Sequence, residues 1–473
     1  MAADIRAALS AIVGESWVTT AAEALVVHAQ DALCYGHRPD VVVTPGAVGE
    51  VADIARLCHD TGTPLVVRGA GTGYTGGAVP IRGGVVVAMA RFNRILAIDE
   101  ANLLAVVEPN VITRDLHRAV EARGLFYPPD PASQAECAIG GNLAECAGGP
   151  RAFKYGTTRR YVLALQVVLP TGEVLRTGSK SVKNVAGYAL TDLIVGSEGS
   201  LAIITEATLR LVPRPRCRRT LSATYDTITA AAEAVGAIVR AGVVPAAVEL
   251  IDGASLAAVA THVGRPMAPD GTAALLIVEV DGSEPAVVHD AALAVAACQE
   301  SGATGVRAAA SETEREALWE ARRELSYALR RLAPRKINHD VVVPRGRVPE
   351  LFALVEQVRA RHRLLIAAFG HAGDGNIHVN LMVHPGDAAE MQRAEAAEHD
   401  LFAGVVALDG SITGEHGVGF AKAAHLRLQL SADEIALHAR VKQAFDPRGI
   451  LNPGKMWETT AADLAGLDVR GRS

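Results

Sequence analysis

The spacing of apolar residues divides the first half of the chain into short strands and amphipathic helices. The runs 41–45 and 64–67 are typical of strands, while residues 48–59 carry apolar side chains three and four positions apart, which predicts a helix. The same reasoning predicts helices within 3–30, a helix at 114–122, and strands at 85–89, 103–108 and 201–205.

A second region begins after the segment LRLVPRP at 209–215, where two prolines and basic residues end the regular pattern and predict a domain boundary. Beyond it, a strand at 273–280 and a helix at 284–298 predict an α+β domain. A longer helix is expected at 311–332, because Ser311 and Glu314 are spaced as a capping box. Its apolar stripe consists of Leu318, Leu325, Leu329 and Leu332.

Arg322 lies at the edge of that apolar stripe, and an arginine at a buried edge needs an anion. One interpretation is an internal salt bridge or a side chain that extends to water. The other is a substrate carboxylate, which a planar guanidinium can bind through two hydrogen bonds.

A glycine-rich segment, RGAGTGYTGG at 68–77, follows the strand at 64–67 and contains the pattern G-x-G-x-x-G. In a nicotinamide-binding fold that pattern opens a helix, whereas here the chain continues through Pro80 into the strand at 85–89. We therefore expect a loop between two strands whose backbone N–H groups can bind an anion. A surface loop without a ligand is the alternative.

Two more glycine-rich segments follow, at 140–149 and at 196–199, and both are expected to be loops that expose their backbone. Three such loops within 140 residues favour one long ligand held by main-chain groups, and a dinucleotide fits better than a mononucleotide.

The segment FGHAGDGNIHVN at 369–380 predicts a hairpin, because an Asp-Gly pair separates two extended runs. Side chains alternate along a strand, so His378 and Asn380 share a face and the turn can bring His371 back towards His378. Glu415 and His416 follow in TGEHG at 413–417. We expect His371, His378 and Glu415 to hold a divalent metal, with His416 as a general base. A hairpin with two solvated histidines is the alternative.

Composition and charge exclude some classes of protein. About half of the 473 residues are apolar (49%) and the formal net charge is −6 without a basic stripe, so the chain is expected to be globular and not to bind nucleic acid. We expect no membrane span and no secretion signal. None of the six cysteines forms a Cys-x-x-Cys pair, which fits the cytoplasm and places any one-electron relay on a partner.

With these features together, the chain resembles the FAD-dependent D-2-hydroxyacid dehydrogenases, which include the flavin subunit of bacterial glycolate oxidase and the D-lactate and D-2-hydroxyglutarate dehydrogenases. The matching motifs are RGAGTGYTGGAVP, PPDPASQ, IGGNLAECAGG, KYGTT, KNVAGYALTDLIVGSEGSLAIITEATLRLVP, FGHAGDGNIHVN, GEHGVG and FDPRGILNPGKM.

The resemblance implies an α+β chain with a vanillyl-alcohol-oxidase (PCMH)-type FAD-binding domain at 36–215, preceded by N-terminal helices at 1–35. An α+β cap domain at 216–435 would carry the metal site, and a C-terminal segment at 436–473 would return to the FAD domain. Noncovalent FAD is implied, because the first glycine-rich loop contains no histidine.

The resemblance also assigns residues. His416 would be the base, Arg322, Ser326 and Asn380 would bind substrate, and His371, His378 and Glu415 would bind zinc or manganese. FAD would contact Arg68, Gly69, Ala70, Gly71, Thr72, Gly73, Gly76, Gly77, Pro129, Ser133, Gly140, Gly141, Asn142, Gly148, Tyr155, Gly156, Glu198, Ile204 and Asn452.

Some positions depart from the family pattern. Cys146 and Ala189 stand where relatives often have asparagine and aspartate. Hydroxyglutarate enzymes have a threonine where this chain has Ser326, and they have a lysine near 338, where the nearest lysine, Lys336, is out of register. These two differences favour a substrate with a single carboxylate.

The expected reaction is metal-assisted oxidation of D-lactate or glycolate to the 2-oxo acid, with hydride transfer to flavin. Electrons would pass to an iron–sulfur subunit and quinone, an electron-transfer flavoprotein or a cytochrome. A cytoplasmic enzyme is expected, with membrane association through a partner and a homodimer as options. The alternatives are a D-2-hydroxyglutarate dehydrogenase, a non-catalytic flavin subunit and a metal-dependent hydrolase.

Overall fold

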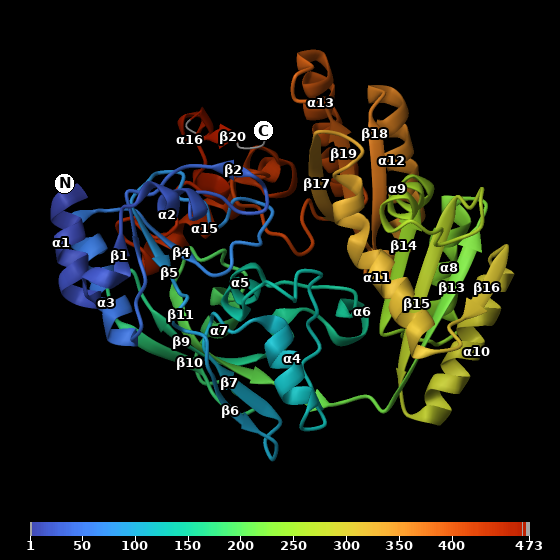
Figure 1. Ribbon diagram of the computed structural model, residues 1–473, viewed down its shortest axis with the longest axis horizontal. Helices are drawn as coiled ribbons and strands as arrows, with labels where there is room; N and C mark the ends of the chain where they lie inside the picture. Colours follow the sequence, from blue (N-terminus) through green and yellow to red (C-terminus); the bar gives the residue numbers. More distant parts are fainter. Residues whose placement is uncertain (1, 466, 470–473) are drawn as a thin grey trace. The chain divides into compact units, whose positions relative to one another are not determined.

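The computed structural model describes residues 2–465 and 467–469, and it divides into two compact units (Figure 1). Unit 1 comprises Met1–Ala147, Thr157–Arg214 and Glu415–Ser473, and unit 2 comprises Gly148–Gly156 and Pro215–Gly414. The chain thus leaves unit 1 near the double-proline segment and re-enters it at Glu415. The functional domains at 36–215 and 216–435 stay a prediction.

Unit 1 contains a four-stranded sheet of order β1-β3-β5-β4, in which β3, β5 and β4 are parallel. Its strands are β1 (Val18–Thr19), β3 (Val41–Val43), β5 (Val85–Ala88) and β4 (Leu65–Arg68). The valine-rich β3 and β5 are buried on both faces, as expected for central parallel strands. Helices α1 (Ala2–Val13) and α3 (Val48–Thr61) pack against this sheet.

A second sheet of unit 1 is antiparallel, with the order β10-β9-β11-β7-β6. Its strands are β10 (Val174–Gly178), β9 (Val162–Val168), β11 (Ile203–Arg210), β7 (Leu104–Val107) and β6 (Ile95–Asp99). The remaining elements are α2 (Ala22–Val27), β2 (Tyr35–Gly36), α4 (Thr113–Glu121), β8 (Leu125–Phe126), α5 (Ile139–Glu145), α7 (Leu190–Ile194), β12 (Val212–Pro213), α14 (Leu426–Gln429), α15 (Ala432–Phe445), α16 (Ala461–Ala465) and β20 (Asp468–Val469).

Unit 2 is built on a seven-stranded antiparallel sheet of order β16-β13-β15-β14-β18-β19-β17. The strands are β13 (Cys217–Tyr225), β14 (Ala247–Asp252), β15 (Ala274–Gly282), β16 (Gly305–Ala308), β17 (Arg335–Val342), β18 (Leu365–His371) and β19 (Asn376–Val383). Its helices are α6 (Ala152–Tyr155), α8 (Ile228–Arg240), α9 (Gly253–Val263), α10 (Glu284–Glu300), α11 (Glu312–Leu329), α12 (Val348–His362) and α13 (Ala388–Ala407).

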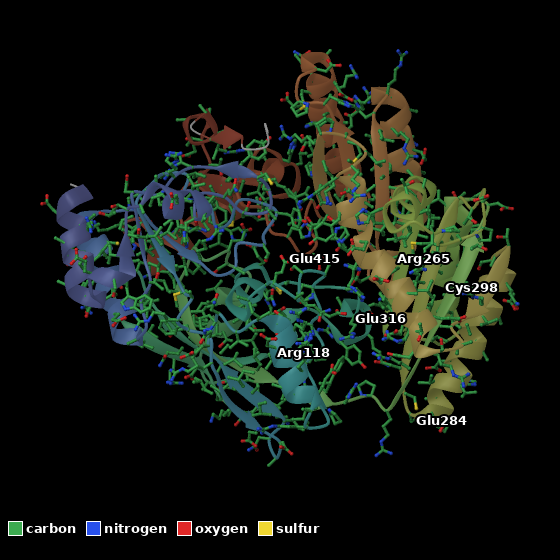
Figure 2. All side chains as sticks on the ribbon, in the orientation of Figure 1. Arg118, Arg265, Glu284, Cys298, Glu316 and Glu415 are labelled. Carbon is green, nitrogen blue, oxygen red and sulfur yellow. The ribbon has the colours of Figure 1, made fainter. Side chains whose placement is uncertain are left out.

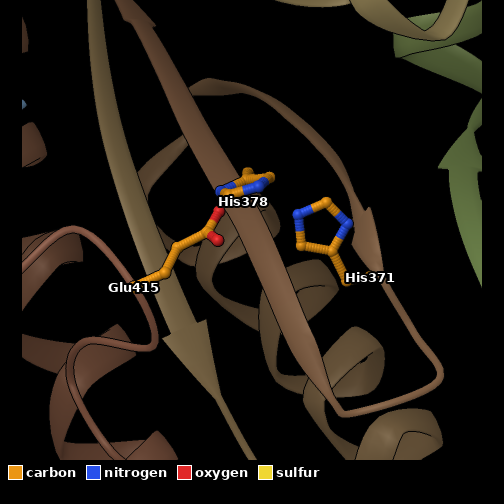
Figure 3. A group of neighbouring side chains, drawn as sticks. All are labelled: His371, His378 and Glu415. Carbon is orange, nitrogen blue, oxygen red and sulfur yellow. The ribbon is translucent and has the colours of Figure 1, made fainter. Parts of the chain in front are cut away.

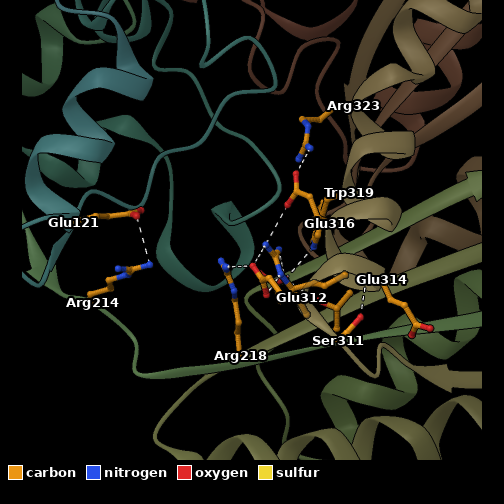
Figure 4. A network of polar contacts seen from close by, with 12 residues as sticks. Glu121, Arg214, Arg218, Ser311, Glu312, Glu314, Glu316, Trp319 and Arg323 are labelled. Atoms are coloured by element: carbon orange, nitrogen blue, oxygen red, sulfur yellow. Dashed lines mark hydrogen bonds and ion pairs between the residues drawn. The ribbon is translucent and has the colours of Figure 1, made fainter. Parts of the chain in front are cut away.

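Helix α11 is attached to the sheet of unit 2 by apolar packing and by polar contacts. Leu325 and Leu329 are buried in a cluster with Ile251 and Ile277. Nearer its start, the Trp319 indole donates to Glu279 at 2.9 Å, and Ser311 accepts from the Glu314 amide (Figure 4). These contacts fix the side of α11 that carries Arg322.

Most of the elements expected from the sequence are present, with two corrections. Residues 3–30 are not entirely helical, because the short strand β1 pairs with β3. Residues 140–149 do not form a loop throughout, because Ile139–Glu145 is the helix α5. Gly140 is needed for packing, since a Cβ there would lie 2.7 Å from Cβ of Pro109.

The six cysteines are free thiols, and Cys298 lies on the buried side of α10 (Figure 2). Within 2–465 and 467–469, no helix combines the length and the apolar character that crossing a bilayer requires.

Candidate active site and cofactor-binding loops

The predicted histidine hairpin is present as β18 and β19, which pair antiparallel across a four-residue turn containing Asp374 and Gly375. His371 ends β18 and His378 lies on β19, and both side chains are buried. Their ring centroids are 5.2 Å apart and nearly perpendicular. The hairpin therefore brings the two imidazoles together as the alternation of side chains predicts.

Asp340 holds the segment that leads to Glu415. This fully buried residue lies opposite His378 on β17. Its carboxylate accepts from the Gly414 amide at 2.9 Å and from the Thr413 hydroxyl at 3.2 Å. Because Gly414 directly precedes Glu415, these bonds fix the backbone from which the Glu415 side chain extends.

His371, His378 and Glu415 together form a group that can hold a metal ion. One nitrogen of each histidine and one carboxylate oxygen of Glu415 lie within 4.8 Å of one another, and the side chains point towards a common point (Figure 3). Two imidazoles and a carboxylate are a ligand set typical of Zn²⁺ and of its first-row neighbours, and three protein ligands leave positions for a substrate.

Behind His371 lies Glu249, a residue that the sequence did not identify. It is fully buried on β14, and its Oε1 accepts from Nδ1 of His371. Burial alone would raise the pKa of Glu249, but the Arg322 guanidinium and His371 hold this pKa at about 2. Glu249 is therefore a carboxylate, and a hydrogen bond at Nδ1 leaves Nε2 of His371 as its metal-binding nitrogen.

Arg322 is buried on α11, as its position at the edge of the apolar stripe predicted. The anion that it contacts within the protein is Glu249, which accepts from Nε. Its guanidinium carbon also lies 4.7 Å from the ring centroid of Phe369. The internal salt bridge is thus present, and a role for the remaining guanidinium N–H groups in substrate binding stays a prediction.

His416 is held by the first glycine-rich loop. Its ring stacks on Tyr74 with centroids 5.2 Å apart, and its carbonyl accepts from the Thr75 hydroxyl at 3.1 Å. Nε2 of His416 lies 4.0 Å from Oε1 of Glu415. This histidine therefore directly follows a candidate metal ligand and contacts the loop expected to bind FAD.

The first glycine-rich loop fits an anionic group. It joins the parallel strands β4 and β5 without a helix, as expected. Arg68, which ends β4, is buried, and within the described part of the chain its Nη1 has no hydrogen-bond partner. A buried guanidinium nitrogen beside exposed backbone amides is suited to a phosphate.

The predicted loop at 196–199 and the C-terminal segment meet the first loop through Glu198 and Asn452. The Asn452 amide donates to the carbonyls of Gly77 and Glu198 at 2.9 and 2.7 Å. The Glu198 carboxylate accepts from the amides of Val418 and Gly419, both at 2.7 Å. The C-terminal segment, the 196–199 turn and the first loop are thereby joined.

The remaining residues predicted to contact FAD lie in both units, and most of them make hydrogen bonds within the protein. Pro129 bonds His117 through its carbonyl, and the Asn142 side chain donates to Thr113. Ser133 accepts backbone bonds in a turn, and Ile204 immediately precedes a β-bulge in β11. Gly69 lies beside Gly141, whereas Gly148, Tyr155 and Gly156 belong to unit 2, where Tyr155 donates to Asp281.

Gly71→Ala is expected to weaken FAD binding and to destabilise unit 1. Gly71 has φ of +71°, where a non-glycine residue costs about 1–2 kcal/mol, and its new Cβ would collide with the Arg68 guanidinium. FAD affinity from flavin fluorescence quenching and the thermal midpoint would measure the effect. Gly49→Ala is the control, because a Cβ there meets nothing within 4 Å; equal losses in both variants would contradict this interpretation.

The structure places Lys336 near two of the predicted substrate-binding residues, Ser326 and Asn380. Because β17 pairs with β19, Lys336, Asn338 and Asp340 share the face that also carries Asn380 and His378. Nζ of Lys336 donates to the Ser326 hydroxyl at 2.6 Å. The buried Asn380 amide bonds Asn338 and the carbonyls of Ala367 and His378.

Comparison with known proteins agrees with this fold and identifies the family. Residues 39–178 match the family described as "FAD binding domain", and residues 214–456 match "FAD linked oxidases, C-terminal domain". The chain is 44% identical over 427 residues to "Glycolate oxidase subunit GlcD" of Bacillus subtilis, covering 90% of this chain and 91% of the relative. This chain belongs to the FAD-dependent D-2-hydroxyacid dehydrogenases.

A second relative agrees with that assignment, and solved structures agree with the fold. A "D-lactate dehydrogenase" of Anaerostipes hadrus is 34% identical over 426 residues, covering 89% of this chain and 90% of the relative. The solved structure of p-cresol methylhydroxylase has a TM-score of 0.80 at 17% identity, with 96% of each chain covered. The structure of 4-ethylphenol oxidase from Gulosibacter chungangensis has a TM-score of 0.78 at 20% identity, with 97% of each chain covered. The fold is therefore of the vanillyl-alcohol-oxidase type, as expected.

Proposed function

We propose that this flavoenzyme oxidises a short D-2-hydroxy acid, D-lactate or glycolate, to the 2-oxo acid. The observation that carries the proposal is the convergence of His371, His378 and Glu415, with a buried arginine linked to His371 through Glu249. A 2-hydroxy acid offers the hydroxyl and carboxylate oxygens that such a set would bind. The similarity to relatives named for glycolate and D-lactate supports the same substrate class.

The divalent metal, when bound, would supply a Lewis acid for the hydroxyl oxygen, and FAD would supply a hydride acceptor. His416 takes the hydroxyl proton, which a free alcohol would not give up to a histidine at neutral pH. Arg322 binds the substrate carboxylate and so fixes the direction of the Cα–H bond. His371, His378 and Glu415 would hold zinc or manganese.

We infer that the electrons leave to an external acceptor. The Bacillus subtilis relative is named as a subunit, which supports a multi-subunit assembly with an acceptor on a partner chain. An iron–sulfur subunit passing electrons to quinone, an electron-transfer flavoprotein and a cytochrome are the candidates. A cytoplasmic location, membrane association through that partner and a homodimer remain predictions.

D-2-Hydroxyglutarate is a second candidate substrate, and the surroundings of Lys336 favour it. Lys336 and Ser326 are hydrogen-bonded, and Lys336 lies on the sheet face of Asn380 and His378. An ammonium and a hydroxyl there could bind a second carboxylate. The departure of Lys336 from the family pattern counts against such a substrate, whereas its contact with Ser326 supports one.

If D-2-hydroxyglutarate is a substrate, its KM is expected to rise as pH increases from about 6 to about 8. Burial lowers the pKa of Lys336 to about 7, and the nearby Arg330 adds to that shift, so the ammonium is present below this pH and is lost above it. Lys336→Met should raise this KM about 10–100-fold and remove the dependence on pH, as expected for a lost charged hydrogen bond. D-Lactate is the control, because it has no second carboxylate; a parallel change in its KM would contradict the assignment.

Steady-state turnover with a dye acceptor tests the proposed substrate class. We would compare kcat/KM for glycolate, D-lactate, L-lactate and D-2-hydroxyglutarate. Preference for glycolate or D-lactate supports the first proposal, and preference for the dicarboxylate supports the second. Turnover of L-lactate alone would overturn both.

A further inference from the structure

We propose that Glu249 is a positioning residue that orients the metal ligand His371 and the carboxylate-binding Arg322 at the same time. This inference rests on the proposed function, because it concerns how the metal site and the substrate arginine are held. It predicts that metal binding and substrate binding both depend on the Glu249 carboxylate, which itself contacts neither the metal nor the substrate.

Glu249 is fully buried in β14, within a run of otherwise apolar residues. A buried carboxylate is strongly unfavourable unless it is paired and hydrogen-bonded. Here each oxygen has its own partner: Oε2 accepts from Nε of Arg322, and Oε1 accepts from Nδ1 of His371. The two partners come from different elements, α11 and β18, so the carboxylate links a helix to a strand.

The contact with His371 follows from the register of the sheet. Glu249 lies directly opposite His371 in the β14–β18 pair, so their side chains share a face. Because Nδ1 donates its proton to Glu249, the Nε2 lone pair is available to a metal and the plane of the ring is fixed. Partners of this kind set the tautomer, the direction and the basicity of a ligand histidine.

The contact with Arg322 fixes the other half of the site. Nε is held by Glu249, and the guanidinium lies over the Phe369 ring at 4.7 Å. Phe369 is two residues before His371 on β18, so one strand supplies both the metal ligand and the surface on which Arg322 rests. With Nε held, the two terminal nitrogens form the edge that would bind a substrate carboxylate through two parallel bonds.

Glu249 could also act simply by attaching α11 to the sheet. That role can be separated from the positioning role, because Glu279 is a second buried glutamate that contacts α11. Glu279 lies on the neighbouring strand β15, and it accepts from Trp319, three residues before Arg322 on α11. The β14–β15 register places Glu279 opposite Ala247 and therefore on the same sheet face as Glu249. The Glu279 carboxylate contacts Thr220, Arg315 and Trp319.

The test compares Glu249→Gln with Glu279→Gln in the FAD-loaded enzyme. An amide is nearly isosteric, but it can accept only one of the two hydrogen bonds. We expect Glu249→Gln to weaken Zn²⁺ binding roughly 10–100-fold in competition with a chromophoric chelator, and to raise KM for D-lactate at saturating Zn²⁺. Glu279→Gln is expected to retain the Zn²⁺ affinity and the KM of the wild type.

The outcomes separate this inference from the proposed function. A wild-type enzyme that binds no Zn²⁺ or Mn²⁺ would overturn the proposed metal site. A wild type that binds Zn²⁺ and a Glu249→Gln variant with the same affinity and KM would overturn the positioning role alone, as would equal losses in the two variants. If Glu249→Gln does not fold, Glu249→Asp keeps the charge but is too short to reach both partners, and the same losses are expected.

Discussion

His378→Ala is expected to remove the bound divalent metal and to lower kcat/KM for the 2-hydroxy acid about 10³-fold or more, because a Lewis acid contributes several kcal/mol to stabilising the developing alkoxide. His378 is one of three candidate ligands, and its replacement leaves only one histidine and one carboxylate. Elemental analysis of the purified variant would measure the metal, and turnover with a dye acceptor would measure the activity. The FAD content should not change, because the glycine-rich loops are intact.

His384→Ala is the matched control for that experiment. His384 directly follows β19, it is exposed, and it pairs with Glu390. This variant should keep the metal and the activity of the wild type. Full activity of a metal-free His378→Ala protein would show that the metal takes no part in the reaction.

His416→Gln is expected to lower the rate of flavin reduction about 10²–10⁴-fold while metal and FAD remain bound, as for the loss of a general base. The metal is retained because Glu415 and the two histidines are unchanged, and FAD is retained because Arg68 and its loop are unchanged. Anaerobic stopped-flow absorbance would separate this step from reoxidation.

His425→Gln, nine positions later in the same segment, is the control for His416 and should reduce at the rate of the wild type. An unchanged rate in His416→Gln would exclude this histidine as the base. If, in addition, the wild type does not oxidise any 2-hydroxy acid, the result would favour a non-catalytic flavin subunit.

Local patterns were sufficient to predict much of the candidate site. The Asp-Gly turn and the alternation of side chains determine where His371 and His378 lie, because both depend only on contacts within one hairpin. The absence of a helix after the first glycine-rich loop was also predictable, since Pro80 and the valine run that follows specify a strand. Arg322 was identified as buried from the helical spacing of its apolar neighbours.

Features that depend on contacts between distant segments were not predictable in the same way. Glu249 lies 122 positions from His371 and 73 from Arg322, and the sequence shows only an acid with apolar neighbours on both sides. The face on which Lys336 lies depends on the pairing of β17 with β19. Gly140 favoured a loop by propensity, but the close approach of Pro109 explains a glycine within a helix.

The most direct test of the central claim is an anaerobic visible spectrum of the purified, FAD-loaded enzyme during titration with D-lactate or glycolate, before and after treatment with a chelator. We predict that one of these acids bleaches the flavin band near about 450 nm, that the chelator prevents bleaching, and that added Zn²⁺ or Mn²⁺ restores it. Undiminished bleaching in protein shown to be metal-free would contradict metal-assisted oxidation. Bound flavin that no 2-hydroxy acid reduces would contradict the proposed substrate class.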